Sequence, residues 1–465
     1  MWVAVIDCLV GVFAIFLLFG NRTMKMSEVT GSLTVSELLG KRYNSKAVQM
    51  FTALVILIFE TVYLVSIYMG LSLLLLYAMP NINPNTSYTI AVVLCGIITI
   101  IYLNIGGAHG TITTDIVESI IMLAGVAVIF FAGMKAVGGL GGLIDGLNGI
   151  DPTGGLTRFP GAGGFGIVGY ILVTAFGVWG MPQLISRYFT VNKKKSIRGG
   201  LFISVLWALV VAMLAWWNGA IGRLYFAQHP EQVQVFVTDA VVRAEILPAL
   251  VSALLPPIFV AIFMAAILAA SLTTGEKVIM VASGTFSRDF YQNITKCSDE
   301  KAMKVTKVLN IFVITVGVVL ALTKPDAVLA LCMFAWAAIA SVVLVPYVVG
   351  LYWKKASAKA VILSGFVALF TALFWKMGIV GMGTSPAFAA FPFLKTVMVM
   401  QNGAEVSLPN FILFQFDGKG VALSKIHEFV VSQVVAFISF PIISLLNKKG
   451  VNKEQVDKLF SDMGY

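Results

Sequence analysis

The sequence predicts an all-α polytopic membrane protein. Of its 465 residues, 59% are hydrophobic and only 12% are charged, and the mean hydropathy is +0.93. A soluble globular domain carries about 25% charged residues, so this composition excludes an ordinary water-soluble fold. The apolar residues also gather into runs long enough to cross a bilayer, which takes about 17–25 residues.

About eleven such runs follow one another along the chain. Two of them, 48–79 and 246–283, are longer than a perpendicular span needs, so we expect tilt, a break or extension beyond the membrane. Residues 1–446 are predicted to form a single transmembrane domain, and 447–465 a polar tail. We expect 381–425 to be an external loop with room for a short interfacial helix. The predicted spans are roughly 2–20, 48–79, 88–104, 116–137, 165–186, 200–225, 246–283, 306–323, 327–353, 359–380 and 426–446.

Lysine and arginine are distributed unevenly between alternate loops. Five lie in each of 21–47, 187–199 and 284–307, and that side of the predicted membrane holds 22 in all, against nine on the other side. The positive-inside rule assigns the richer side to the cytoplasm. We therefore expect a plasma-membrane protein with a cytoplasmic C-terminus, and topology explains the net charge of +10 without a nucleic-acid partner.

The remaining reactive residue types form no catalytic or metal-binding pattern. The four cysteines, Cys8, Cys95, Cys297 and Cys332, show neither CxxC nor Cys/His spacing, and the three histidines are isolated. The sequence has no HExxH motif and no nucleophile elbow. We therefore expect no enzyme activity, no disulfide framework and no obligate protein partner.

One polar stretch, SLTTGEK, interrupts the long run 246–283. On a helix, Ala270, Thr273, Thr274 and Lys277 share one face because they stand at i, i+3, i+4 and i+7. Two hydroxyls and the Ala270 carbonyl are neutral, hard oxygen ligands that suit Na⁺. The alternative is that both threonines hydrogen-bond to carbonyls one turn earlier, as is common in membrane helices.

Four segments, in order along the chain, resemble the sodium:solute symporter family, including its bacterial proline and pantothenate branches. ILAASLTTGEKVIMVASGTFSRDFYQ resembles the family's signature helix. The other segments are TVSELLGKRYNSKAVQMFTALVILIFETVY (34–63), IYLNIGGAHGTITTDIVESIIML (101–123) and GVWGMPQLISRYFTVNKKKSIRGG (177–200). The resemblance covers the chain to about residue 380. It implies the LeuT-like five-plus-five inverted-repeat transporter fold, with substrate and ions at mid-membrane beside broken helices.

The resemblance also implies a function. The family's sodium site maps onto Ala270, Thr273 and Thr274, so Na⁺ is the expected coupling ion. The expected activity is secondary active, sodium-coupled symport of a small organic solute, an amino acid or organic acid, into the cell by alternating access. The expected partners are that solute and membrane lipid. Because the family usually begins with two further helices, we expect this sequence to lack them.

A second ion site found in some family members maps onto three charged residues here. Its aspartate corresponds to Asp115, and its hydroxyl positions are occupied by Glu276 and Lys277. We hypothesise that the Lys277 ammonium pairs with Asp115 and replaces a second sodium. The alternative is that Glu276 and Lys277 mark the cytoplasmic water boundary.

The predicted substrate cavity involves two helices. Glu60 is a carboxyl group inside the span 48–79, and Tyr63 matches a family position near the cavity. Thr174 and Val178 replace the Trp and Tyr of the proline-transporting branch, which predicts a different solute. Two other interpretations stay open, namely proton-coupled transport with Lys277 in place of a sodium, and a truncated family member that does not transport.

Overall fold

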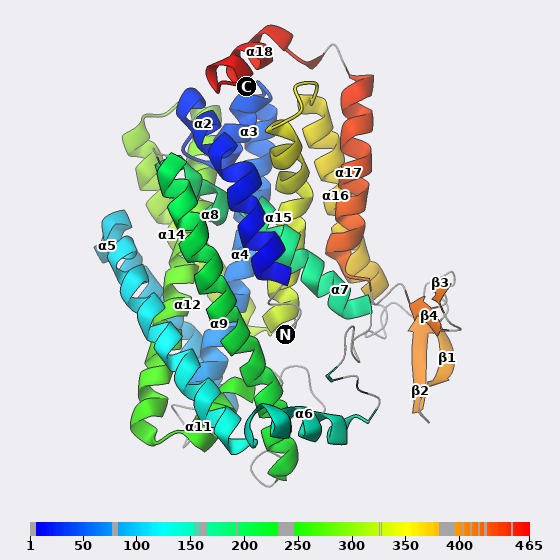
Figure 1. Cartoon of the computed structure of the whole chain (residues 1–465). Coiled ribbons are helices and arrows are strands. Elements are labelled where there is room, and N and C mark those ends of the chain that lie inside the picture. The colour runs from blue at the N-terminus through cyan, green and yellow to red at the C-terminus, as the bar shows by residue number, and fades with distance from the viewer. Residues whose placement is uncertain are drawn as a thin grey trace.

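A computed structural model of the chain describes residues 6–76, 82–152, 154, 156–157, 165–191, 194–230, 246–324, 326, 328–380, 396–401, 404–409, 412–416, 419–422, 426–447 and 450–465. In some helical stretches, 104–115 and 269–270 among them, only the backbone is described. The described part is a bundle of long helices with a small β segment beside it (Figure 1).

The helical elements are, in chain order, η1 (Asp7–Val12), η2 (Ile15–Gly20), α2 (Asn21–Thr30), α3 (Val35–Arg42), α4 (Lys46–Leu76), α5 (Pro84–Ala136), α6 (Gly139–Ile150), α7 (Phe165–Leu172), η3 (Val173–Gly177), η4 (Val178–Gly180), α8 (Pro182–Ile185), η5 (Ser186–Thr190), α9 (Lys194–Gln228), α11 (Ile246–Leu254), α12 (Pro257–Thr285), η7 (Phe286–Tyr291), α13 (Gln292–Thr295), α14 (Asp299–Leu322), α15 (Val328–Gly350), α16 (Ala358–Phe374), η8 (Trp375–Val380), α17 (Glu428–Leu446) and α18 (Lys453–Asp462).

The spans agree with the hydropathy pattern. Among the described residues, eight helices are long and apolar enough to cross a membrane, and a bent pair, Ile167–Gly180 with Pro182–Thr190, makes a ninth. The two other expected runs are also helical where the structure describes them, the first as η1 and η2 from Asp7 to Gly20 and the second, 246–283, as α11 and α12. The expected break in 246–283 falls at Pro256, between α11 and α12. The run 48–79 lies largely in α4, an unbroken helix of 31 residues.

One expectation about a connecting segment was wrong, and another segment contains structure that was not predicted. The predicted link 105–115 has helical backbone and belongs to the 53-residue helix α5, which contains both neighbouring spans. The predicted external loop 381–425 contains two antiparallel hairpins among its described residues, and the suggested interfacial helix stays a prediction because 381–395 lie outside them. Its strands are β1 (Thr396–Gln401), β2 (Ala404–Pro409), β3 (Ile412–Phe416) and β4 (Lys419–Ala422).

The hairpins have a local cause that the hydropathy analysis overlooked. Asn-Gly separates the first two strands in the sequence and Asp-Gly the last two, and both dipeptides favour two-residue hairpin turns. In the first hairpin, Val399 pairs with Val406 and Thr396 with Pro409. The all-α class therefore describes the membrane bundle, and the strands form an insertion between α16 and α17.

Helix α15 lies at the centre of the largest hydrophobic cluster, with residues from α3, α4, α16 and α17 around it. Between Ala335 and Ala340 it presents mainly alanines, all fully buried. Small side chains allow close helix approach, and in lipid such packing replaces the hydrophobic effect as the main stabilising contribution. A second cluster joins α4 to α12 and α14, so α4 packs between α15 and α12.

Candidate functional site

The helix that covers 165–190 is broken in its middle. Its two halves, Ile167–Gly180 and Pro182–Thr190, meet at an angle of 52°. Met181 at the break has an extended backbone (φ −78°, ψ 117°), because Pro182 has no N–H and disfavours helical conformation in the residue before it. Backbone groups released from helical bonding at such a break are available to a solute or an ion.

The break packs closely against α15. A methyl group built on Gly180 would lie 3.0 Å from the Cα of Ala340, a backbone atom. A larger residue would push α15 away by a few tenths of an ångström, so space favours glycine here, and the η3 and η4 segments both contact α15. The sequence analysis predicted a single span over 165–186 and did not predict the break at Met181.

Helix α12, which carries the predicted sodium ligands, packs against α4 and against α8. Thr273 is 5% exposed and Thr274 is half-buried, and the backbone at Ala270 is helical. The next residue, Gly275, faces α4: a methyl group there would lie 3.4 Å from Leu64 and 3.8 Å from Ile67. Helix α8 is the first helical turn after the break.

Of the charged pair that follows, the acidic residue is buried inside the bundle. Glu276 is 1% exposed, Lys277 is half-buried, and α12 continues to Thr285 beyond them. Burial of Glu276 fits an embedded site better than a water boundary. The side chain of Asp115 lies outside the described residues, so its pairing with Lys277 stays a prediction.

The four predicted cavity residues all lie near α15. Tyr63 on α4 meets the Trp336 ring edge to face, with 5.8 Å between centroids. Thr174 lies in η3, and its hydroxyl donates to the Tyr170 carbonyl at 3.0 Å, so this hydroxyl is already used within the helix. Val178 begins η4. The sequence analysis missed Trp336, although an aromatic residue among alanines on a buried helix is a signal that it could have used.

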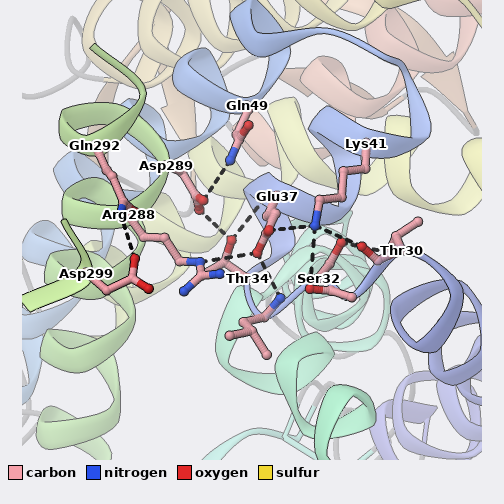
Figure 2. A network of polar contacts seen from close by, with 12 residues as sticks. Thr30, Ser32, Thr34, Glu37, Lys41, Gln49, Arg288, Asp289, Gln292 and Asp299 are labelled. Atoms are coloured by element: carbon pink, nitrogen blue, oxygen red, sulfur yellow. Dashed lines mark hydrogen bonds and ion pairs between the residues drawn. The ribbon is translucent and has the colours of Figure 1, made fainter. Parts of the chain in front are cut away.

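A polar network fastens the end of α12 to α3 and α4 (Figure 2). Thr34 is the N-cap of α3: its hydroxyl accepts from the Glu37 N–H at 3.0 Å and donates to one carboxylate oxygen of Asp289 on η7. Gln49 on α4 donates to the other Asp289 oxygen at 2.9 Å. Glu37 forms ion pairs with Lys41 at 2.7 Å and with Arg288 at 3.4 Å.

The pKa values of the two carboxyl groups in this network are shifted in opposite directions. Burial raises the pKa of Asp289 to about 7, and the hydrogen bonds from Thr34 and Gln49 only partly oppose it. Burial also acts to raise the pKa of Glu37, but the hydrogen bonds from Lys41 and the Leu33 N–H, with the Arg288 charge, bring it below its ordinary value. The network therefore holds one firmly ionised and one easily protonated carboxyl group.

A family model described as the sodium:solute symporter family matches residues 1–368. The chain belongs to the sodium:solute symporter family. The sodium/pantothenate symporter of Haemophilus influenzae is 26% identical over 357 residues, covering 75% of this chain and 70% of that protein. The high-affinity proline transporter PutP of Bacillus subtilis is 26% identical over 385 residues, covering 80% and 77%.

A solved structure has the same fold. It is the substrate-bound, outward-open state of a Na⁺-coupled sialic acid symporter, with a TM-score of 0.61, 16% identity and coverage of 96% of this chain and 89% of that one. The expected LeuT-like fold is thereby confirmed. Family membership and these relatives make the symporter described here a multi-pass, sodium-coupled solute transporter, with Na⁺ as its coupling ion.

Proposed function

We propose that this symporter carries a small organic solute into the cell and that its sodium ion binds the Ala270 carbonyl and the hydroxyls of Thr273 and Thr274. The observation that carries this proposal is the position of the threonine pair on α12, a helix in contact with α8 directly after the break at Met181. A broken helix beside a hydroxyl-bearing helix supplies backbone and side-chain oxygens at one depth of the membrane.

Sodium binding by neutral oxygens explains how the ion can enter and leave. Because no ligand of this set carries a charge, the empty site buries no uncompensated anion, which would be costly inside a membrane. Each sodium that enters releases about 2.3 kcal/mol per 100 mV of membrane potential. A tenfold sodium gradient adds about 1.4 kcal/mol, so at 100 mV one ion can drive accumulation of about 500-fold.

The orientation belongs to the same proposal. Figure 1 shows α18 lying across the end of the bundle beside α2 and α3, and Lys25 on α2 donates to the Met463 carbonyl at 2.8 Å. The basic residues Lys41 and Arg288 lie in the network at this end of the bundle. We assign the α18 end to the cytoplasm by the positive-inside rule, which makes transport from the opposite end inward.

The test is uptake by the full chain in proteoliposomes with an imposed sodium gradient. The solute panel includes proline, pantothenate, sialic acid and other small amino acids and carboxylates, because proline, pantothenate and sialic acid are solutes of relatives or of the structural neighbour. We expect uptake of at least one solute with sodium and none when choline replaces it. Uptake that does not depend on sodium would overturn the coupling.

Two variants test the ligands. Thr273→Val and Thr274→Val keep the side-chain shape and remove a hydroxyl, so each should raise the sodium concentration for half-maximal uptake about tenfold or more, the effect of about 1.4 kcal/mol. Thr315→Val is the matched control, because Thr315 is exposed on α14 and donates only to the Ile311 carbonyl of its own helix. If all three variants keep the parental sodium dependence, the site lies elsewhere.

A further inference from the structure

Glu60 is a fully buried carboxyl group without a hydrogen-bond partner among the described residues. Its side chain is 0% exposed, and neither carboxylate oxygen accepts a hydrogen bond from any group that the structure describes. No ion pair with Glu60 occurs in the described part of the chain either. Such a group needs an explanation, because an unpaired carboxylate in hydrocarbon costs several kcal/mol.

Its depth places this carboxyl group near the middle of the membrane, the level at which transporters with inverted repeats bind their solutes. Glu60 lies near the middle of the span Lys46–Leu75, roughly 20 Å along the helix from Lys46 at about 1.5 Å per residue. One turn further along α4, Leu64 packs against Gly275, the residue next to Thr274. Glu60 and Leu64 share a helix face, so Glu60 lies one turn from the contact with the predicted sodium helix.

Aromatic rings from α4 and α15 surround the position. Phe59 meets Phe334 edge to face at 6.0 Å, and Tyr63 meets Trp336 at 5.8 Å. The Glu60 carboxyl is close enough to Tyr63 and to the Cys332 thiol for its charge to act on both. Aromatic faces beside a carboxylate form a typical environment for an organic ammonium group, which they attract through cation–π interaction.

A second polar group lies in the same surroundings. Trp336 Nε1 is buried without a hydrogen bond of good geometry among the described residues, although it lies close enough to the Tyr63 hydroxyl to act on it. An indole N–H can only donate, so a solute oxygen beside it would receive a better hydrogen bond than the one Tyr63 offers. The carboxyl group of Glu60 and the N–H of Trp336 thus suit complementary groups, a cation for the first and an acceptor for the second.

We propose that Glu60 binds the ammonium group of the transported solute and that Trp336 Nε1 donates to an oxygen of the same molecule. The solute is then an amine that also carries a hydroxyl or carboxylate, and Glu60 is the residue that selects the amine. This inference rests on the proposed function, because it assumes that a solute reaches the centre of the bundle. The bound ammonium supplies the positive charge that the buried carboxylate lacks.

The test uses pairs of solutes that differ only in the amine. 4-Aminobutyrate is compared with butyrate, alanine with lactate, and glucosamine with glucose, each as a competitor of sodium-dependent uptake by the full chain in proteoliposomes. We expect the amine-bearing member of at least one pair to compete at a concentration tenfold or more below that of its partner. In Glu60→Gln, which removes the charge and keeps the shape, this ratio should fall close to one.

Two further variants separate a binding role from a structural one. Glu60→Asp keeps the charge and should retain the preference for amines at reduced affinity. Glu300→Gln removes a carboxylate that is exposed and paired with Lys304 at 2.8 Å, and should leave the ratio unchanged. If Glu60→Gln does not fold, the parental protein's ratio still decides between amine-bearing and amine-free solutes.

The outcomes distinguish this inference from the function beneath it. Sodium-dependent uptake in which amine-free solutes compete equally well, or an unchanged ratio in a folded Glu60→Gln protein, overturns the role of Glu60 and leaves sodium symport intact. The absence of sodium-dependent uptake for every solute overturns the proposed function, and the inference fails with it.

Discussion

Gln49 on α4 donates a hydrogen bond of 2.9 Å to Asp289 on η7, although 240 residues separate them in sequence. Thr34, just before α3, donates to the other oxygen of the same carboxylate. Asp289 therefore connects the end of the predicted sodium helix to two elements from the first part of the chain. If α12 moves relative to α4 during alternating access, these hydrogen bonds must either break or carry the start of α4 with them.

Asp289→Asn should change the pH dependence of stability. In the folded protein the pKa of Asp289 is raised from 3.8 to about 7, so the folded state holds a proton that the unfolded state has already lost between these two values. Stability therefore falls as the pH rises from about 4 to about 7, and the cost is fully present above pH 7. Asparagine removes that cost, which is about 4 kcal/mol because one pKa unit corresponds to about 1.4 kcal/mol.

The measurement is thermal unfolding of both proteins in detergent between pH 4.5 and 8. Relative to the parental protein, the melting temperature of Asp289→Asn should increase with pH up to about 7 and level off above it. Glu37 and Arg288 also lie in this network, and because Glu37 stays ionised above its lowered pKa, its charge does not alter the slope in this range. A constant difference between the two proteins would contradict the assignment.

Glu37→Gln should destabilise the α3 end of the bundle. The carboxylate accepts from the Leu33 N–H at 3.0 Å and pairs with Lys41 and Arg288. Both cations are about 40% exposed, so the loss should be about 1–2 kcal/mol and not the larger cost of a fully buried pair. The free energy of unfolding of both variants is measured by denaturant titration. Glu300→Gln breaks an ion pair whose two members are exposed, and should cost less than about 0.5 kcal/mol.

Gly180→Ala should reduce the rate of transport, although both halves of the broken helix can still form. The added methyl group meets the α15 backbone at 3.0 Å, so the broken helix and α15 must move apart, at a cost of about 1–3 kcal/mol. Gly219→Ala on α9 is the control, because a methyl group there has no atom within 4 Å. Uptake rates at equal protein amount compare the two, and equal rates would show that the break tolerates separation from α15.

Phe460→Ala should release α18 from the bundle. Phe460 is buried, with the Arg42 guanidinium 5.3 Å and the Lys354 ammonium 5.3 Å from its ring centre. Loss of a buried aromatic side chain costs about 3–5 kcal/mol in a rigid core, which is enough to undock a helix of ten residues. Hydrogen exchange across 453–462 should then become fast, whereas exposed Glu454→Ala should leave it slow.

The positions of the spans could be predicted from the sequence because lipid imposes a local requirement. Each span must be apolar and must satisfy its own backbone hydrogen bonds, so hydropathy alone locates α4, α15 and α17. The same local logic was available for the two hairpins, since Asn-Gly and Asp-Gly turns were present in the sequence and were overlooked. The threonine pair and the buried Glu60 were likewise recognisable as polar groups in apolar runs.

The tertiary structure decided which of these polar groups have partners. Thr174 uses its hydroxyl within its own helix, Asp289 receives hydrogen bonds from residues 34 and 49, and Glu60 receives none from the described residues. Sequence spacing fixes the face of a helix on which a side chain stands, but the neighbouring helix is set by packing over hundreds of residues. A buried carboxyl group is therefore visible in the sequence, and its need for a cation becomes visible only when the surrounding helices are in place.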